Sequence, residues 1–375
     1  MPRAIRSRKS PMSMPCLEIA ILGLSITSSW GNGHATTYRG LVQALVERGH
    51  AVLFLERDVP WYAAPRDLPT PPYGRTELYT SLEDLQDRFT TAIQHADLVM
   101  VGSYVPEGVA VGTWVTQITT GVSAFYDIDT PVTLAKLRSG DHEYLSPELI
   151  PRYGLYLSFT GGPILRHLER GYGAAMARPL YCSVDPQCYA PEEGERPYDL
   201  GYMGTYSADR QATLDALLLE AAQHWPEGRF VVAGPQYPAT IPWPDNVERL
   251  DHVPPTAHRG FYNAQRFTLN ITRTEMRQVG FAPSVRLFEA AACATPMISD
   301  YWPGLETFFT LGTELLVSRS AAETLHYLRD LSPEAGRALG ARARERVLAE
   351  HTAAHRAEIL EEYVLEARAT RRVQS

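Results

Sequence analysis

Residues 281–289 read FAPSVRLFE, and they lead into a helix that the small apolar run AAACA continues over 290–294. An apolar strand is predicted directly afterwards, at Met297–Asp300. Ser284 is a favoured residue type for a helix N-cap. A loop that opens a helix presents unpaired backbone N–H groups and a partial positive charge, both of which attract an anion. The stretch therefore predicts a strand–loop–helix unit that binds an anionic ligand.

A second unit of this kind lies near the other end of the chain. The apolar run IAILGL at 19–24 is followed by GNGH at 31–34, which opens a predicted helix over 35–48. Glycine lets a ligand approach the backbone closely, and His34 can exchange protons near neutral pH. The alternative is a tight turn that ends in a surface histidine. Two such units, one in each half, predict an α/β protein with two Rossmann-like domains that face each other across a cleft.

Short apolar strands alternate with helices along the rest of the chain, which is typical of parallel sheets. We predict further strands at 51–56, 97–102, 121–126, 155–159, 198–203, 229–233, 247–250, 267–271 and 315–317, and further helices at 82–94, 208–223, 322–330, 333–349 and 352–369. The Pro- and Tyr-rich stretch 59–75 is too polar and broken for core. The expected organisation is a disordered leader over 1–14, an N-terminal domain over 15–170, a linker over 171–198, a C-terminal domain over 199–350, and a C-terminal helix over 351–375 that could cross back to the N-terminal domain.

Composition excludes several classes of protein. A net charge of −8 argues against a nucleic-acid binder, which would need a basic face. No apolar run reaches the roughly 20 residues that span a bilayer. The basic start could be misread as a signal peptide, but Glu18 interrupts the apolar run and no cleavage site follows. The 4 cysteines lack zinc spacing and disulfide density, so we expect free thiols and a cytoplasmic protein. Nothing in the pattern indicates an oligomeric state.

Lysine is nearly absent, since only Lys9 and Lys136 occur among 35 basic residues. An anion bound by the C-terminal half must therefore meet arginine, backbone amides or helix termini. Three arginines surround the 281–294 stretch and are candidates for holding a diphosphate: Arg273, Arg277 and Arg286. A second candidate phosphate turn runs from Gly204 to Arg210, with Ser207 as its N-cap. The alternative is that some of these arginines are ordinary solvated side chains.

Two acidic positions complete the candidate site. Glu289 is the only acid in its helix, and a carboxylate there would suit ribose hydroxyls as donors. The alternative is a structural pair with Arg286, which lies three residues earlier on the same side of the helix. Asp127-Ile128-Asp129 ends a predicted strand, at the edge where α/β proteins bind ligands. Pro131 ends the strand, so we favour substrate hydrogen bonding or loop structure over a metal pair, and we predict no metal site.

Three stretches resemble glycosyltransferases of the GT-B architecture, specifically the group related to the spore-maturation protein CgeB. The first is SWGNGH at 29–34, taken with RGH at 48–50 and LERDVPWY at 55–62. The second is YDIDTP at 126–131. The third and most specific is PSVRLFEAAAC at 283–293, taken with WPGLE at 302–306. The resemblance spans nearly the whole chain.

This resemblance implies that the N-terminal domain holds an acceptor and the C-terminal domain holds a nucleotide sugar, without an obligatory metal. Glu289 matches the glutamate that binds ribose in related retaining enzymes, and His34 matches the base of some inverting relatives. The chain departs from the retaining pattern in three places. It has Phe281 where those enzymes carry a second glutamate, it has no lysine for the diphosphate, and it has Ala294 where glycine is usual.

We therefore expect a metal-independent glycosyltransferase of the hexosyltransferase class, with a nucleoside diphosphate sugar as co-substrate and no other cofactor. His34 and Asp127 are the candidate catalytic residues that orient or deprotonate an unidentified acceptor. The candidate donor-binding residues are Gly33, Gly204, Arg210, Arg273, Arg277, Ser284, Arg286 and Glu289. Two alternatives stay open: a nucleotide-sugar epimerase on the same architecture, and a non-catalytic relative that binds a nucleotide or glycan, which Phe281 favours.

Overall fold

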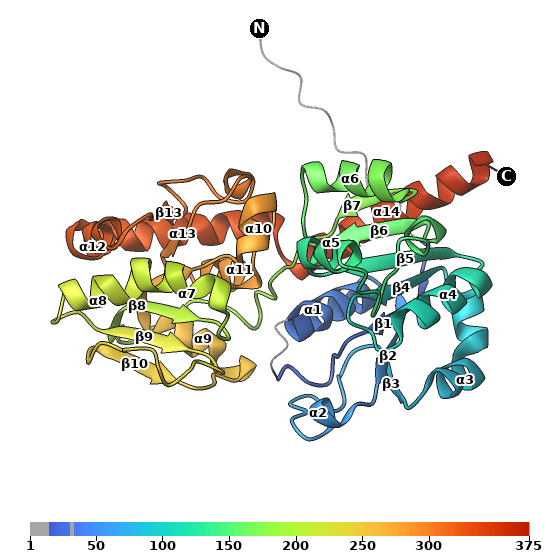
Figure 1. The fold of residues 1–375 in the computed structure, drawn as a ribbon, viewed down its shortest axis with the longest axis horizontal. Helices are drawn as coiled ribbons and strands as arrows, with labels where there is room; N and C mark the ends of the chain where they lie inside the picture. Colours follow the sequence, from blue (N-terminus) through green and yellow to red (C-terminus); the bar gives the residue numbers. More distant parts are fainter. Residues whose placement is uncertain (1–14, 31–33, 375) are drawn as a thin grey trace, which may run out of the picture.

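The computed structural model describes residues 15–30 and 34–374 and contains two sheets whose neighbouring strands pair in parallel. The first sheet has the strand order β3-β2-β1-β4-β5-β6-β7, and the second has the order β10-β9-β8-β11-β12-β13. Helices cover both faces of each sheet, so central strands such as β4 (Leu98–Gly102) and β5 (Val122–Asp127) are buried throughout. The predicted pair of Rossmann-like α/β domains is confirmed (Figure 1).

The N-terminal domain carries the first sheet. Its other strands are β1 (Glu18–Gly23), β2 (Ala51–Arg57), β3 (Arg75–Tyr79), β6 (Leu155–Ser158) and β7 (Ala177–Pro179). Its helices are α1 (His34–Glu47), α2 (Pro60–Ala63), α3 (Leu82–His95), α4 (Gly108–Ile118), α5 (Thr130–Arg138), a 3₁₀ turn at Ile150–Arg152 and α6 (Pro163–Tyr172). Helix α5 begins directly after β5 because Pro131 is favoured in a first helical turn.

The C-terminal domain carries the second sheet. Its strands are β8 (Tyr198–Met203), β9 (Phe230–Ala233), β10 (Val247–Leu250), β11 (Gln265–Asn270), β12 (Met297–Ser299) and β13 (Leu316–Val317). Its helices are α7 (Ala208–Leu214), a π-helical segment at Asp215–Leu219, α8 (Glu220–His224), α9 (Pro255–Asn263), α10 (Thr274–Val279), α11 (Val285–Ala292), a 3₁₀ turn at Leu305–Thr307, α12 (Ala321–Asp330) and α13 (Pro333–Glu350). The last helix, α14 (Ala353–Gln374), follows α13.

Two strands lie where the sequence pattern predicted none. Strand β3 begins at the end of the Pro- and Tyr-rich stretch and pairs with β2 at the edge of the sheet. Strand β7 lies inside the expected linker 171–198 and pairs with β6 at the opposite edge. Both are short edge strands with weak apolar alternation, which explains why the pattern does not reveal them. The expected leader 1–14 and the GNG part of the first loop lie outside the described residues.

Two segments carry the chain between the domains, and they are bonded to each other. Val184 and Thr352 form an isolated parallel bridge, in which Ala353 N–H donates to the Val184 carbonyl (3.0 Å). The buried guanidinium of Arg356 donates to the carbonyls of Tyr181 (3.0 Å) and Cys182 (3.2 Å) on the outgoing segment. It also donates to the Glu350 carbonyl on the returning one (3.1 Å). We call this arrangement the Arg356 clasp.

Helix α14 returns to the N-terminal domain and packs against α1 (Figure 1). Glu361 of α14 is buried and accepts hydrogen bonds from Arg48 (2.5 and 2.6 Å). It also accepts a hydrogen bond from His50 Nε2 (2.8 Å). Nε2 is the donor because the other ring nitrogen, Nδ1, accepts a hydrogen bond from the Leu17 N–H (3.1 Å). These bonds hold the pKa of Glu361 below its ordinary value. No helix in the described part of the chain is both long and apolar enough to span a membrane.

We expect Glu361→Gln to loosen α14 from α1 and to reduce the free energy of unfolding by about 1–3 kcal/mol, the scale of hydrogen bonds to a charged group. A lowered folded-state pKa gives stability that is present above the unfolded pKa and lost as the pH falls through the folded value. The variant should therefore lose less stability on acidification than the wild type. Denaturant unfolding at several pH values measures this, with the exposed Glu362→Gln on the same helix as control. Equal effects of the two variants would contradict the assignment.

Candidate active site

A cavity of about 390 Å³ lies between the carboxyl edges of the two sheets. The N-terminal domain contributes Ser29, His34, Asp129 and Phe159 to its wall. The larger part of the wall comes from the C-terminal domain, from the loops after β8, β9, β10 and β11 and the first turns of α11. Parallel strands bring these loops together because all of their carboxyl ends meet at one edge of a sheet.

Most of the residues singled out from the sequence lie around this one cavity: His34, Gly204, Arg210, Arg273, Ser284, Arg286 and Glu289. Arg277 is exposed on α10 and is not part of the wall. Burial raises the pKa of the nearby Asp300 to about 6, and the charge of Arg277 opposes this rise. Gly33 lies outside the described residues. The sequence pattern gave no signal for His258 and Tyr262, which also line the cavity.

Three arginines of the wall have no carboxylate partner among the described residues: Arg210, Arg273 and Arg286. The Nε atoms of Arg210 and Arg273 are buried and without any hydrogen-bond partner. A buried N–H that is left unpaired costs about 1–3 kcal/mol. Since guanidinium groups bind phosphate well, these unpaired donors indicate a site for an anionic ligand.

Arg286 is held in place by neutral groups. Its Nε donates to the Met203 carbonyl (2.5 Å), and a terminal nitrogen donates to Asn270 Oδ1 (2.9 Å). Ser284 occupies the N-cap position, but its hydroxyl donates to the same Asn270 oxygen (3.0 Å) and does not cap the helix. The amides of the first turn of α11 therefore receive no bond from that side chain. Arg286 keeps its full charge next to them.

Glu289 is buried at the base of the cavity. Oε2 accepts a hydrogen bond from Tyr262 Oη (2.9 Å), and burial raises the pKa of Tyr262 so that it stays a donor. Burial raises the pKa of Tyr189 as well, and a hydrogen bond from Tyr189 to this carboxylate adds to the rise. Arg286 does not form an ion pair with it, so the structural pair considered from the sequence is absent from this part of the chain. Glu289 can therefore accept hydrogen bonds from a ligand.

His258 supports the wall beside Glu289. Its Nε2 donates to the Val253 carbonyl (3.1 Å), which leaves Nδ1 to accept from Tyr189 Oη (3.2 Å). Nδ1 lies 4.0 Å from Glu289 Oε2. The contacts hold the imidazole beside the carboxylate, and they connect the interdomain segment that carries Tyr189 to the cavity.

His34 lies across the cavity at the start of α1. Its Nε2 is 3.8 Å from Asp129 Oδ2, and its ring meets the edge of Phe159. Tyr104 Oη donates to the same Asp129 oxygen (3.0 Å). Desolvation lowers the pKa of His34, Asp129 opposes this, and Arg273 adds to the lowering. The imidazole is therefore neutral at pH 7, and it lies close enough to Arg273 for that positive charge to affect its pKa.

Asp127 was expected to contact an acceptor, and the structure corrects this. Its side chain is fully buried, does not line the cavity, and accepts hydrogen bonds from Tyr156 Oη (2.5 Å) and Thr133 Oγ1 (2.7 Å). Burial raises its pKa to about 6. The strand ends at Asp127 with that side chain turned into the core, so the next acid in the motif, Asp129, reaches the cavity instead.

Phe281 joins the two domains next to the cavity. Its N–H donates to the Pro303 carbonyl (2.7 Å) in the C-terminal domain, and its carbonyl accepts from Gly161 N–H (2.9 Å) in the N-terminal domain. The ring lies between Gly162 (φ 68°) and Gly304 (φ 91°), where an added Cβ would come within 2.3 and 2.4 Å of it. Phe281 itself has a φ of 51°, an uncommon conformation for a large residue. The ring therefore acts as an interdomain wedge.

Comparison with known proteins gives a family match and many similar folds. Residues 210–362 match a family model described as "Glycosyl transferase-like". No curated protein sequence matches the chain. The structure resembles sucrose-phosphate synthase from Thermosynechococcus elongatus, with 16% identity and a TM-score of 0.67 over 94% of this chain and 99% of that one.

Two further similar structures contain nucleotide. Anabaena HepE in complex with UDP and glucose gives 12% identity and a TM-score of 0.70 over 93% of this chain and 100% of that one. An α-glucosyltransferase in complex with UDP and a 13-mer DNA gives 13% identity and a TM-score of 0.71 over 94% of this chain and 100% of that one. The fold is that of GT-B glycosyltransferases.

We expect Phe281→Ala to weaken the contact between the domains, because the ring that fills the space between the two glycines is lost. The apparent melting temperature should fall by several degrees, in line with roughly 1–3 kcal/mol for a partly buried large-to-small change. Proteolysis of the interdomain segment should become faster. Phe281→Leu, which keeps most of the volume, serves as the control and should behave like the wild type. If alanine leaves both measurements unchanged, Phe281 does not hold the domains together.

Proposed function

We propose that this protein transfers a sugar from a uridine diphosphate donor to a hydroxyl or amine acceptor. The observation that carries the proposal is a set of three arginines without acidic partners among the described residues, on the cavity wall that also contains Glu289. Two of them, Arg210 and Arg273, have buried Nε atoms without a hydrogen-bond partner in this part of the chain. A nucleoside diphosphate supplies what this wall lacks, namely anionic oxygens for the arginines and hydroxyl donors for the carboxylate. UDP is chosen because similar structures contain it.

In this proposal Glu289 binds the ribose hydroxyls. Arg210, Arg273, Arg286 and the first-turn amides of α11 bind the diphosphate, so no metal ion is needed. Among the described residues no group of three or more His, Cys, Asp or Glu side chains could hold one. The positive charges would stabilise the diphosphate more strongly as it leaves, since negative charge builds up on its bridging oxygen.

The sugar would lie between the diphosphate and His34. The acceptor oxygen or nitrogen forms a bond to the anomeric carbon, the bond from that carbon to the diphosphate breaks, and the acceptor proton goes to His34. A neutral imidazole suits this role, and Asp129 would stabilise the imidazolium that forms. Asp129 acts through His34 and is therefore a positioning residue.

Finer assignments remain part of the proposal. The WGNGH, YDIDTP and PSVRLFE stretches support membership of the CgeB-related group. The net charge of −8 supports an acceptor other than nucleic acid, and the four free cysteines support a cytoplasmic protein. The hexosyltransferase class follows from the same resemblance.

Titration of UDP into the protein in the presence of EDTA tests donor binding. We expect UDP to bind equally well with EDTA and with magnesium. Glu289→Gln should weaken binding by about 1–3 kcal/mol, or roughly 5- to 150-fold, because the carboxylate no longer accepts bonds as an anion. Glu345→Gln, an exposed acid on α13, is the matched control and should leave the affinity unchanged.

Different results would point elsewhere. Binding that appears only with a divalent ion would contradict the metal-free diphosphate site. Unchanged affinity in Glu289→Gln would remove the ribose assignment. Release of an altered donor sugar without any acceptor would favour the epimerase, and UDP-sugar binding without turnover of any kind would favour a non-catalytic role.

The pH profile of transfer tests the role of His34. We expect His34→Ala to cut turnover by about 10²–10⁴-fold with little change in UDP affinity. Only neutral His34 accepts a proton, and its pKa lies below 6.5, so kcat/KM should fall on the acid side below that pH. Asp129→Asn removes the charge that raises this pKa, so the acid limb should move to lower pH. Arg273→Gln removes a charge that lowers it, so the limb should move to higher pH. Shifts in the same direction would contradict this arrangement.

A further inference from the structure

Two exposed tryptophans stand out on the N-terminal domain. Among the described residues only four large hydrophobic side chains are strongly exposed, and Trp30 (51%) and Trp61 (59%) are two of them. Trp30 lies in the loop after β1, and Trp61 lies in α2, shortly after the end of β2. Because β1 and β2 are parallel neighbours, both tryptophans project from the same edge of the sheet. This edge also contributes Ser29 and His34 to the cavity wall.

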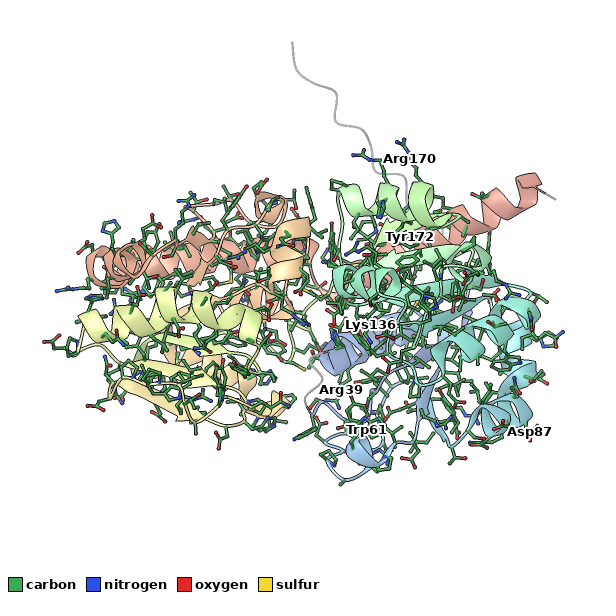
Figure 2. All side chains as sticks on the ribbon, in the orientation of Figure 1. Arg39, Trp61, Asp87, Lys136, Arg170 and Tyr172 are labelled. Atoms are coloured by element: carbon green, nitrogen blue, oxygen red, sulfur yellow. The ribbon has the colours of Figure 1, made fainter. Side chains whose placement is uncertain are left out.

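The segments that carry the two tryptophans are hydrogen-bonded to each other. Ser28 Oγ donates to the Pro65 carbonyl (3.0 Å), and Leu68 N–H donates to the Thr27 carbonyl (3.0 Å). Ser29 N–H donates to Asp67 Oδ1 (2.8 Å). The stretch 65–68 just after α2 is therefore fastened alongside the loop that precedes Trp30. Arg39 also binds Asp67, and Figure 2 shows Trp61 and Arg39 on the part of this domain toward the C-terminal domain.

A buried carboxylate makes this loop rigid. Glu56, at the end of β2, is completely buried and accepts hydrogen bonds from Ile26 N–H (2.7 Å) and Thr27 N–H (3.0 Å). It also accepts from the hydroxyls of Ser25 (3.0 Å) and Thr27 (2.6 Å). The segment before Trp30 is thus ordered by the fold itself. Binding of a partner to Trp30 therefore does not carry the entropic cost of ordering that segment.

Three arginines on or beside the segments that carry the tryptophans form ion pairs. Arg39 pairs with Asp67 (2.8 Å), Arg66 with Asp58 (2.6 Å) and Arg57 with Glu107 (2.9 Å). The opposite wall has arginines without acidic partners in the described part of the chain and suits an anion, whereas each of these three arginines is neutralised by an acid. This surface therefore favours an uncharged partner that offers an apolar face to an aromatic ring and hydroxyls to the surrounding polar groups.

We propose that Trp30 and Trp61 form the binding surface for the acceptor, and that the acceptor is a neutral saccharide. One face of a pyranose ring carries mainly C–H groups, which pack on the electron-rich face of an indole. The hydroxyls of the saccharide would donate hydrogen bonds to Asp58 and Asp67. The saccharide would then extend past Ser29 into the cavity beside His34, since both residues line its wall. This inference rests on the proposed function for its place in the reaction, whereas its test measures binding alone.

The test probes the full chain, saturated with UDP, on an array of immobilised neutral oligosaccharides and their sulfated and uronic-acid counterparts, with a single-stranded DNA 13-mer as a further probe. We expect retention on neutral glycans only. The best neutral oligosaccharide is then titrated in solution against the variants. Trp30→Ala and Trp61→Ala should each weaken binding at least tenfold, whereas Trp61→Phe should keep most of it.

Tyr301→Ala is the matched control, since Tyr301 is an exposed aromatic residue (43%) on the other domain and should leave binding within twofold. Equal melting temperatures and equal UDP affinities of the variants show that the fold and donor site are intact. No retained neutral glycan, equal binding by the tryptophan variants, or tryptophan-dependent binding of acidic glycans or DNA would each overturn the proposal. If UDP fails to bind the wild type but neutral glycans bind through the tryptophans, the donor assignment fails and the saccharide surface stands.

Discussion

The buried guanidinium of Arg356 fixes how the two domains meet. It has no acidic partner among the described residues and is held by backbone carbonyls of the two segments that cross between the domains, and by Nδ1 of His351 (2.9 Å). Burial and the charge of Arg356 lower the pKa of His351 to about 3, so His351 is a neutral acceptor that stacks on Phe288 of α11. The clasp thereby connects the crossing segments to the helix that carries Arg286 and Glu289. A cavity made from two domains depends on such a connection, because neither sheet contains the whole wall.

The two walls of the cavity differ in whether their arginines are paired with acidic side chains. On the C-terminal side, Arg286 is anchored by an amide oxygen and a carbonyl, so its charge remains available to a ligand. On the N-terminal side, the arginines near the cavity edge are neutralised by aspartates of the same surface. On the wall of a cavity, an arginine whose charge is not neutralised by an acid suits the binding of an anion. The second arrangement costs little and leaves room for an uncharged partner.

Phe281 occupies the position at which the retaining glycosyltransferases that the chain resembles carry a second glutamate. Here the residue serves contact between the domains, since its ring fills the space between two glycines and its backbone bonds to both sides. The acids that remain on the cavity wall are Glu289 and Asp129, at opposite ends. Under the proposed function, recognition of the donor sugar would use other groups of this wall, such as Thr160 and Thr272.

The sequence alone determined the two parallel sheets, most strands and helices, and the loops that carry ligand-binding groups. Apolar periodicity and the loop-to-helix patterns at 31–34 and 281–289 are local features of the sequence, so they can be recognised without knowing the tertiary structure. They also pointed to Arg273, Arg286 and Glu289 as neighbours of one ligand. Tertiary structure alone decided the rest. Asp127 faces the core and Asp129 the cavity because the strand ends between them, and Arg277 points away because α10 turns it outward. His258, the Arg356 clasp and the pairing of charges around the tryptophans depend on contacts between residues far apart in the chain, which no local pattern encodes.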